Sequence, residues 1–360
     1  MGLYLEATPW SDTHPAMQAL LYTEPFHLNY TETPDPEVGP DDVLVRVKAV
    51  GICGSDVHGY TGRTGRRLPP LIMGHEAAGV VETVGARVKG VAPGSRVCFD
   101  STVCCNRCDA CRQGRYNRCA HRQVLGVSVP GMKRHGAMAD LVRLPWWSLV
   151  EMPAALSFTE AALLEPVSIG LHAVNRGPVA PGETVLIVGA GTIGLFVLQA
   201  ARLKGAGKVI VSDLNTHRLR QAQKLGADVV VSPDDANLAS VVEAQTQGHG
   251  ADVSFEVVGL AQTLQQTLAA TRMGGRVVLV GNLTKTVEID VPDVVSRELT
   301  LRGTYASSGE YRDAVDLVAS GRIDVRPLVN ATLPLSQGQH AFDRLYRGEE
   351  AALIKIVLEP

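Results

Sequence analysis

The stretch from Val185 to Asp213 constrains the fold of this chain more than any other. It opens with an apolar, β-branched run, Val185–Val188, typical of a strand that is buried on both faces. A glycine-rich turn with the sequence GAGTIG and a helix-forming segment, Leu195–Lys204, follow directly. A second apolar strand, Val209–Val211, then leads to Asp213. This order predicts a βαβ unit that binds a dinucleotide at the turn.

Each part of the turn has a physical role in that interpretation. Gly189 permits the tight turn, Gly191 lets the backbone approach a pyrophosphate, and Gly194 lets helix and strand pack closely. The pyrophosphate then lies on the free N–H groups at the start of the helix. Asp213 lies 19 residues beyond Gly194, where a carboxylate accepts hydrogen bonds from a ribose and repels a 2′-phosphate. The expected coenzyme is NAD, and its predicted contacts are Gly189, Gly191, Thr192, Ile193, Gly194, Asp213 and Val280.

Alternating strands and helices continue beyond this unit. Further strands are expected at 229–231, 253–257, 276–280 and 299–303. Thr216 is expected to cap a helix that runs through Lys224 and ends at Gly226. Together these elements predict a six-stranded, doubly wound parallel sheet of the Rossmann type. The strand at 299–303 is expected at the exposed edge of that sheet, where it is a template for pairing with another subunit.

The first third of the chain has a different pattern. In Val43–Ala49 the odd positions are apolar and most even ones are charged, which is typical of a half-buried strand. Residues 77–84 and 96–99 are further strand candidates, and glycine and proline are frequent between them. Short strands with such turns predict a small β-barrel-like domain. Residues 1–16 show no periodicity and are interpreted as a flexible arm, with Met17 as an alternative natural start.

All seven cysteines of the chain lie in this first third. Four of them, Cys105, Cys108, Cys111 and Cys119, stand close together in a polar loop. Four thiolates at such spacing predict a closed tetrahedral zinc site of the structural kind. An iron–sulfur cluster or a set of redox thiols is the alternative. Cys104 and Cys98 are interpreted as ordinary small residues.

Other residues that can bind a metal are scattered. Cys53 and His58 lie in GICGSDVH, His75 and Glu76 in GHEAAG, and Glu165 in LLEP. Taken singly, each has an ordinary interpretation, such as a buried thiol, a loop histidine or a helix-capping carboxylate. Their spacing alone leaves a shared metal site open.

These motifs, taken in order along the chain, resemble those of the zinc-containing medium-chain dehydrogenase/reductases. GICGSDVH, GHEAAGVV, the four-cysteine loop, LLEPVSIGLHA and VGAGTIG carry the resemblance, which is strongest to the sorbitol dehydrogenase-like polyol dehydrogenases. The family implies a GroES-like catalytic domain, here 1–165 and 305–360, and a Rossmann coenzyme domain, here 166–304. It also implies a catalytic zinc in the cleft between the two domains.

The resemblance assigns roles to single residues. Cys53 and His75 match zinc ligands, and either Glu76 or Glu165 is the third ligand. Glu165 stands where related alcohol dehydrogenases have a cysteine. Ser55 and His58 match the family's proton relay, and Arg218 matches a position that lines the adenosine. We expect Glu165 to act chiefly in turnover and Glu76 to contribute to metal binding.

The departures from the family pattern concern the substrate. Sorbitol dehydrogenases typically follow SDVH with an aromatic residue, and this chain has Gly59 there. They also carry an Arg-Tyr pair where this chain has Ala306 and Ser307. Another polyol, a cyclitol, an amino-alcohol or a secondary alcohol is therefore expected in place of sorbitol. A dehydrogenase for simple primary alcohols or aldehydes is the alternative, and a non-catalytic NAD-binding protein of the same fold is a further one.

Composition and net charge indicate which kinds of binding partner to expect. With 360 residues and a hydrophobic share of 45%, the chain can fill two cores. A net charge of −3 argues against nucleic acid or an anionic membrane as partner. The first residues do not resemble a signal peptide, so a cytoplasmic enzyme is expected. The family assembles through its last coenzyme-domain strand, which implies a homodimer or a homotetramer.

Overall fold

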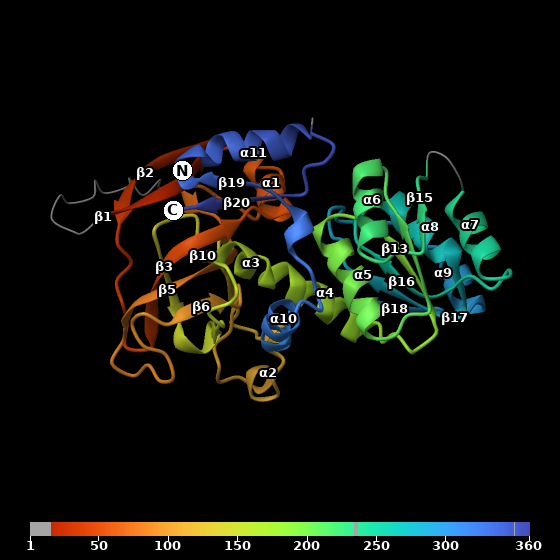
Figure 1. The fold of residues 1–360 in the computed structure, drawn as a ribbon, viewed down its shortest axis with the longest axis horizontal. Coiled ribbons are helices and arrows are strands. Elements are labelled where there is room, and N and C mark those ends of the chain that lie inside the picture. The colour runs from red at the N-terminus through yellow and green to blue at the C-terminus, as the bar shows by residue number, and fades with distance from the viewer. Residues whose placement is uncertain (1–15, 234–236, 349) are drawn as a thin grey trace, which may run out of the picture.

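The computed structural model describes residues 16–233, 237–348 and 350–360, which form two lobes (Figure 1). The first described strand, β1 (Ala16–Glu24), includes Ala16, which the sequence analysis placed in a flexible arm at 1–16. The rest of that arm lies outside the described residues.

The first lobe is built around an antiparallel sheet with one parallel pair. In the described residues this sheet has seven strands, with the path β12-β6-β5-β3-β20-β19 and with β11 also paired to β3. These strands are β3 (Asp42–Gly51), β5 (Glu76–Val84), β6 (Arg96–Phe99), β11 (Leu141–Pro145), β12 (Leu149–Glu151), β19 (Val329–Pro334) and β20 (Lys355–Glu359). A smaller sheet, β2-β1-β4, adds β2 (His27–Pro34) and β4 (Leu71–Ile72). The short antiparallel strands predicted for the first third of the chain are thereby confirmed.

The end of the chain returns to this first lobe. Strand β20 pairs with β3, with Val357 opposite Gly51 and Leu358 opposite Val50. Helix α11 (Gly338–Arg347) lies over the same side of the lobe, near α1 (Gly54–Tyr60). This pairing brings Lys355, the first residue of β20, next to the segment that carries Cys53.

The second lobe contains the predicted parallel sheet. Its strand order, β15-β14-β13-β16-β17-β18, becomes 3-2-1-4-5-6 when the six described strands are renumbered along the chain. This is the doubly wound order in which ligands bind where the strand order reverses, here between β13 and β16. The strands are β13 (Thr184–Val188), β14 (Lys208–Ser212), β15 (Val229–Val231), β16 (Ala251–Glu256), β17 (Thr271–Leu279) and β18 (Thr300–Gly303). The Rossmann prediction is confirmed.

Two local details differ from the sequence-based expectation. Asn215, not Thr216, caps α6 (Thr216–Lys224), because the Asn215 side chain accepts hydrogen bonds from the backbone N–H groups of His217 and Arg218. Asparagine is among the strongest N-cap residues, and here it stands one position earlier than the threonine. Strand β17 starts at Thr271, five residues before the expected Arg276, because Thr271 also pairs with Ala251, ahead of an irregular segment in which Gly274 has a φ of 64°. Neither change alters the topology.

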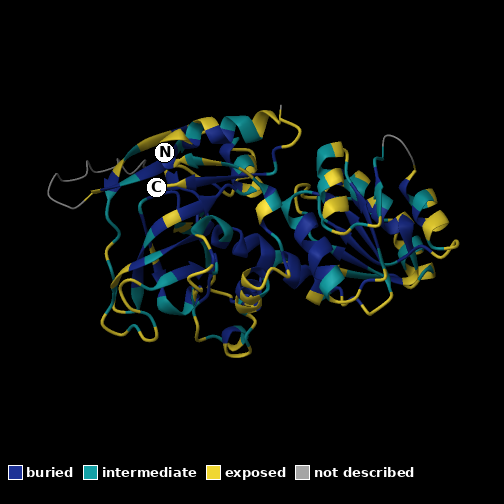
Figure 2. Cartoon of the chain, viewed as in Figure 1, coloured by how far each residue is buried: buried dark blue, intermediate teal, exposed yellow. Residues whose placement is uncertain are grey.

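The two lobes share an apolar core at their junction. Helix α3 (Phe158–Ala162) packs on β3 and β5, and α4 (Leu164–Arg176) packs on α5 (Thr192–Leu203) and α10 (Glu310–Ala319). A Ser157–Glu160 capping box starts α3. Most of α4 is buried, as the dark blue segment between the lobes shows (Figure 2). The start of α4 therefore presents Glu165 at a fixed place in the junction.

Helices α7 (Leu238–Gln245), α8 (Ala261–Ala270) and α9 (Val291–Ser296) also cover the second lobe. The short helix α2 (Asp109–Arg112) lies in the four-cysteine loop of the first lobe. Nowhere in the described ranges is there a helix with the length and hydrophobicity that a membrane crossing requires.

Candidate functional site

The four-cysteine loop forms a compact cluster of thiols. The sulfurs of Cys105, Cys108, Cys111 and Cys119 all lie within 4.8 Å of one another, and Cys104 is not part of the group. The Sγ atoms of Cys108 and Cys111 are 3.4 Å apart, and those of Cys105 and Cys111 are 4.0 Å apart. Sulfurs bound to zinc at about 2.3 Å form a tetrahedron with edges of about 3.8 Å. The geometry therefore fits a structural zinc ion with no room for a further ligand.

The loop itself supports the thiolate form of its first ligand. Backbone N–H groups, those of Arg107 and Cys108, lower the pKa of Cys105 to about 6. Burial raises the pKa of Cys119 to about 11, so this thiol loses its proton only when a cation replaces it. Such a set is typical of a site where metal binding and folding occur together.

A second group of possible metal ligands lies at the start of α1 and β5. One ligand atom each of Cys53, His75 and Glu76 lies within 4.8 Å of the others. Cys53 is the N-cap of α1, and its Sγ accepts a hydrogen bond of 3.4 Å from the backbone N–H of Ser55. A thiolate, an imidazole and a carboxylate form a donor set that suits zinc with a position left open.

Asp56 orients the His75 ring. The Asp56 Oδ2 and His75 Nδ1 atoms form an ion pair of 3.4 Å, and neither atom has another polar partner among the described residues. With Nδ1 facing a carboxylate, Nε2 is the nitrogen left for a metal, an arrangement common for metal-binding histidines. Burial disfavours the charge on Asp56, but His75 and Arg67 more than offset it, so the pKa of Asp56 is lowered.

Glu76 is held by a lysine that the sequence analysis did not identify. Lys355 Nζ lies 2.6 Å from Glu76 Oε2 and also donates a 3.0 Å hydrogen bond to the Ile52 carbonyl. Both side chains are at most 2% exposed. A Cβ at Gly51 would lie 2.5 Å from Glu76 Oε2, so glycine makes room for this carboxylate. In the sequence, Lys355 lies in an apolar run at the end of the chain, and that pattern does not indicate that a lysine there is buried.

Glu165 lies apart from that group of three ligands. Its Oε1 accepts a 3.0 Å hydrogen bond from the Ser101 hydroxyl, and the residue is buried. Burial raises the pKa of Glu165 to about 7, although the charge of nearby His75 opposes the rise. A carboxyl group with such a pKa can exchange a proton near neutral pH.

Ser55 and His58 lie one helical turn apart on α1. The Ser55 hydroxyl is 3.4 Å from Cys53 Sγ, so it lies beside the expected metal position. Both residues are exposed, and positions i and i+3 share one face of a helix. The two polar side chains therefore lead from the group of Cys53, His75 and Glu76 toward the protein surface.

The glycine turn has the geometry of a dinucleotide site. Gly189 has a φ of 106°, and a Cβ at Gly194 would lie 1.8 Å from the Gly189 carbonyl oxygen. Protein packing therefore requires both glycines. A Cβ at Gly191 would touch nothing within 4 Å, so the space beside this glycine is open to a ligand. Thr192 and Ile193 form the first turn of α5, whose free N–H groups face that approach.

Asp213 follows β14, at the edge of the same turn. Its Oδ2 accepts a 2.7 Å hydrogen bond from the Ala190 N–H, and its Oδ1 accepts one of 2.8 Å from the Asn215 N–H. A carboxylate has about four acceptor positions, so acceptors remain for ribose hydroxyls. The Nε of Arg218 is buried and has no hydrogen-bond partner in the part of the chain that is described. Its unsatisfied donor fits a bound adenosine.

The opposite side of the turn is organised by Glu256. This residue ends β16 and is 2% exposed. Its Oε1 accepts hydrogen bonds from Val258 N–H, Gly259 N–H and the Thr263 hydroxyl, at 3.0, 2.8 and 2.7 Å. Its carbonyl oxygen accepts a 2.9 Å bond from the backbone N–H of Val280. The sequence analysis did not identify Glu256. The available signal was an acidic residue at the end of a strand that was expected to be buried.

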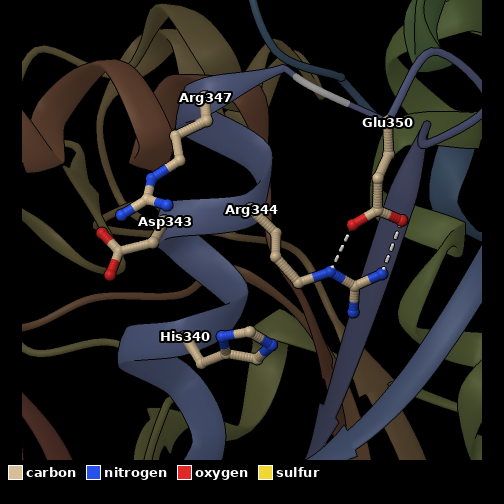
Figure 3. A pocket seen from close by; sticks show the side chains of 5 residues that line it. All are labelled: His340, Asp343, Arg344, Arg347 and Glu350. Atoms are coloured by element: carbon tan, nitrogen blue, oxygen red, sulfur yellow. Dashed lines mark hydrogen bonds and ion pairs between the residues drawn. The ribbon is translucent and has the colours of Figure 1, made fainter.

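The cavity shown in Figure 3 is separate from these sites. It lies on α11, has a volume of about 220 Å³ and is lined by His340, Asp343, Arg344, Arg347 and Glu350. Arg344 and Glu350 form a two-pronged ion pair across it, with bonds of 2.6 and 2.8 Å. None of its lining residues belongs to the metal-ligating groups or to the glycine turn.

Comparison with known families matches both lobes. Residues 39–154 match the alcohol dehydrogenase GroES-like domain, and residues 192–320 match the zinc-binding dehydrogenase family. A sorbitol dehydrogenase of Bacillus subtilis is 35% identical over 348 residues, which cover 96% of this chain and 97% of the relative. An L-idonate 5-dehydrogenase of Vitis vinifera is 38% identical over 327 residues, 88% of each chain.

A solved structure shows the same architecture. A zinc-binding dehydrogenase from Sinorhizobium meliloti bound to NADP superposes with a TM-score of 0.87 at 33% identity. The match covers 96% of this chain and 100% of the other.

Proposed function

Because this chain belongs to the zinc-containing medium-chain dehydrogenase/reductase family, we propose that it oxidises a secondary alcohol of a polyol, cyclitol or amino-alcohol with NAD. The observation that carries the proposal is the group of Cys53, His75 and Glu76 beside the Ser55 hydroxyl. A protein that only binds NAD needs none of these residues.

In the proposed site, Cys53 and His75 hold the catalytic zinc, with Glu76 as the third protein ligand. Zinc at such a site lowers the pKa of a bound hydroxyl, and NAD accepts the hydride. Glu76 is also paired with Lys355 through Oε2, so Oε1 is the oxygen that would be left for the metal. Glu165 lies on the first turn of α4, from where it holds the substrate or its proton.

The protein's part in proton transfer falls to α1. Ser55 accepts the proton of the substrate hydroxyl and passes it toward His58, which lies one turn further along the helix. Both residues are exposed, so the path ends in solvent.

The choice of NAD over NADP rests on Asp213. Its carboxylate is fixed by two backbone hydrogen bonds, so it cannot turn away from a 2′-phosphate. Two like charges about 5 Å apart repel by about 3 kcal/mol at intermediate dielectric. The S. meliloti relative is bound to NADP, so the preference has to be measured for this chain.

The test of the proposed function is a rate panel. NADH and NADPH formation are measured with polyols, cyclitols, amino-alcohols, simple secondary alcohols and primary alcohols. We expect the highest kcat/KM with a secondary carbinol and NAD. Primary alcohols as the best substrates would favour the alternative dehydrogenase, and no turnover with any alcohol or in the reverse direction would contradict the proposal.

Assembly through β18 is part of the proposed function. This strand is the last in its sheet, and nearby apolar side chains are exposed, with Val291 at 61%, Val295 at 67% and Met273 at 68%. Such a patch beside an open strand edge is typical of a subunit interface. We expect a dimer or a tetramer by light scattering at micromolar concentration. Val295→Lys should weaken the association of subunits, whereas Tyr30→Lys on the other lobe should leave it unchanged. A monomeric wild type would contradict the proposal.

A further inference from the structure

The space beside Gly59 is filled by an arginine. A Cβ built on Gly59 would lie 2.2 Å from Arg67 Cγ and 3.2 Å from Arg67 Cβ. The stem of Arg67 therefore crosses α1 at the position where sorbitol dehydrogenase-like proteins have an aromatic residue. Only glycine allows so close an approach, so Gly59 and Arg67 depend on each other.

The neighbouring tyrosine does not replace the missing aromatic ring. Tyr60 is fully buried, and its ring packs against Phe26 and Phe342, with centroids 5.4 and 5.3 Å away. Its hydroxyl donates to Asp343 Oδ1 at 2.8 Å and lies 2.6 Å from the Phe26 carbonyl. Tyr60 thus anchors α1 to α11. The other side of α1, which carries Ser55, is contacted by Arg67.

Arg67 connects the two polar residues of the first turn of α1. Its Nη2 lies 2.9 Å from Asp56 Oδ1 and 3.4 Å from Ser55 Oγ, and its Nε lies 3.3 Å from Asp56 Oδ1. The Arg67 side chain is only 5% exposed. Strand β9 (Val127–Val129) fixes its backbone, because Ser128 exchanges 3.2 Å hydrogen bonds with Arg66 O and Leu68 N–H. Arg67 is therefore fixed at its backbone by β9 and at its guanidinium by Asp56 and Ser55.

We propose that Arg67 is a positioning residue for Ser55, an inference that rests on the proposed role of Ser55 in proton transfer. Arginine has no acceptor, so the Ser55 hydroxyl hydrogen must point away from it. Without a substrate, the Ser55 hydroxyl donates to Cys53 Sγ, 3.4 Å away. Arg67 thus occupies one lone pair of Ser55 and leaves the other lone pair to accept the proton of the substrate hydroxyl. Asp56 balances the charge of Arg67 and at the same time faces His75.

A cycle with Ser55 tests this inference. Arg67→Lys keeps a cation beside Asp56 but loses the planar fork that reaches Ser55. With the best alcohol of the rate panel, we expect Arg67→Lys to lower kcat about tenfold, with KM for NAD unchanged. In a Ser55→Ala background the same change should cause no further loss. Arg66→Lys, at the exposed neighbouring position, is the matched control and should leave kcat unchanged.

The outcomes separate the inference from the proposed function. If Ser55→Ala leaves kcat unchanged, both the role of Ser55 and the role of Arg67 are overturned. If Ser55→Ala lowers kcat but Arg67→Lys lowers it equally in both backgrounds, only the inference about Arg67 is overturned.

Thermal unfolding gives a readout that does not depend on turnover. Alanine is favoured over glycine inside a helix, so Gly59→Ala alone would raise the melting temperature if nothing opposed it. With Arg67 in place, the added Cβ collides with its stem, and we expect a lower melting temperature and the kcat loss of Arg67→Lys. In an Arg67→Ala background, Gly59→Ala should instead raise the melting temperature. The same change in melting temperature in both backgrounds would overturn the dependence of Gly59 on Arg67.

Discussion

The two groups of possible metal ligands differ in where their members come from. The four cysteines lie between Cys105 and Cys119 on one loop, and each offers only a sulfur. The second group takes Cys53 from the start of α1 and His75 and Glu76 from the start of β5. Its surroundings extend to Lys355 at the far end of the chain. The positions of the four cysteines depend on the conformation of one loop. The positions of Cys53, His75 and Glu76 depend on the tertiary structure of the whole lobe.

The groups also differ in what else their members bind. No side chain other than cysteine hydrogen-bonds the four loop sulfurs in the described residues, so a metal is what holds them together. In the second group, His75 faces Asp56, Glu76 pairs with Lys355 and Cys53 accepts from Ser55. These partners orient the ligands and leave them able to share the metal with a substrate. The first arrangement suits a structural site and the second a catalytic one.

The largest effect should follow from breaking the closed group. Cys111→Ser should remove the structural zinc and lower the free energy of unfolding by about 5 kcal/mol or more, because metal binding there is coupled to folding. Zinc per subunit by mass spectrometry and denaturant unfolding measure the two effects together.

Cys104→Ser is the matched control for that change. Cys104 is also buried in the loop but lies outside the group of four, and its carbonyl accepts from the Trp147 indole at 3.0 Å. The Cys104→Ser variant should keep the structural zinc and nearly all of the stability of the wild type. Loss of zinc in Cys104→Ser, with zinc retained in Cys105→Ser, would mean that another cysteine register binds the metal.

The next largest effect concerns the buried ion pair. Lys355→Met leaves the Glu76 carboxylate buried without its cation, which typically costs about 3–5 kcal/mol of stability. Glu76→Gln in the same chain should restore much of that loss, since the second charge is then removed. Chemical unfolding of the two single variants and the double variant measures the coupling. If the double variant is as unstable as the sum of the singles, the pair does not act as a unit.

The two carboxylates can be separated by comparing turnover with zinc content. Glu165→Ala should lower kcat about a hundredfold and leave zinc content nearly unchanged, because Glu165 is bonded to Ser101 and lies outside the group of three. Glu76→Ala should lower both moderately. The opposite pattern, with the catalytic zinc lost only in Glu165→Ala, would make Glu165 the direct ligand.

The smallest of these effects concerns the coenzyme. Asp213→Ser should shift the ratio of kcat/KM for NAD to that for NADP about tenfold to a hundredfold toward NADP, or about 1.4–2.7 kcal/mol. The affinity for NAD should also fall, because the variant loses the bonds to Ala190 and Asn215. Equal efficiency of the wild type with both coenzymes would contradict the role of Asp213.

The sequence could predict those parts of the molecule that depend on local pattern. The strand, glycine turn and helix around Gly189 follow from short-range sterics, and the same holds for the strands of the parallel sheet. The spacing from Cys105 to Cys119 is likewise local. The resemblance to a family added the roles of Cys53 and His75, which no spacing rule supplies.

What the sequence could not supply are the contacts made over long distances in the chain. Lys355 meets Glu76 across 279 positions, because β20 pairs with β3. Arg67 reaches Ser55 because β9 holds its backbone and Gly59 has no side chain to block it. Each of these residues is an ordinary surface type in a linear pattern, and only tertiary packing buries its charge.

The central claim is that the dispersed group holds a catalytic zinc, and Cys53→Ser tests it most directly. Zinc per subunit and NADH formation with the best alcohol are measured for this variant and for Cys98→Ser, a buried thiol outside both groups. We expect about two zinc ions in the wild type and in Cys98→Ser. Cys53→Ser should keep about one zinc and the folded state but lose turnover. Full zinc content with wild-type turnover in Cys53→Ser would contradict the account.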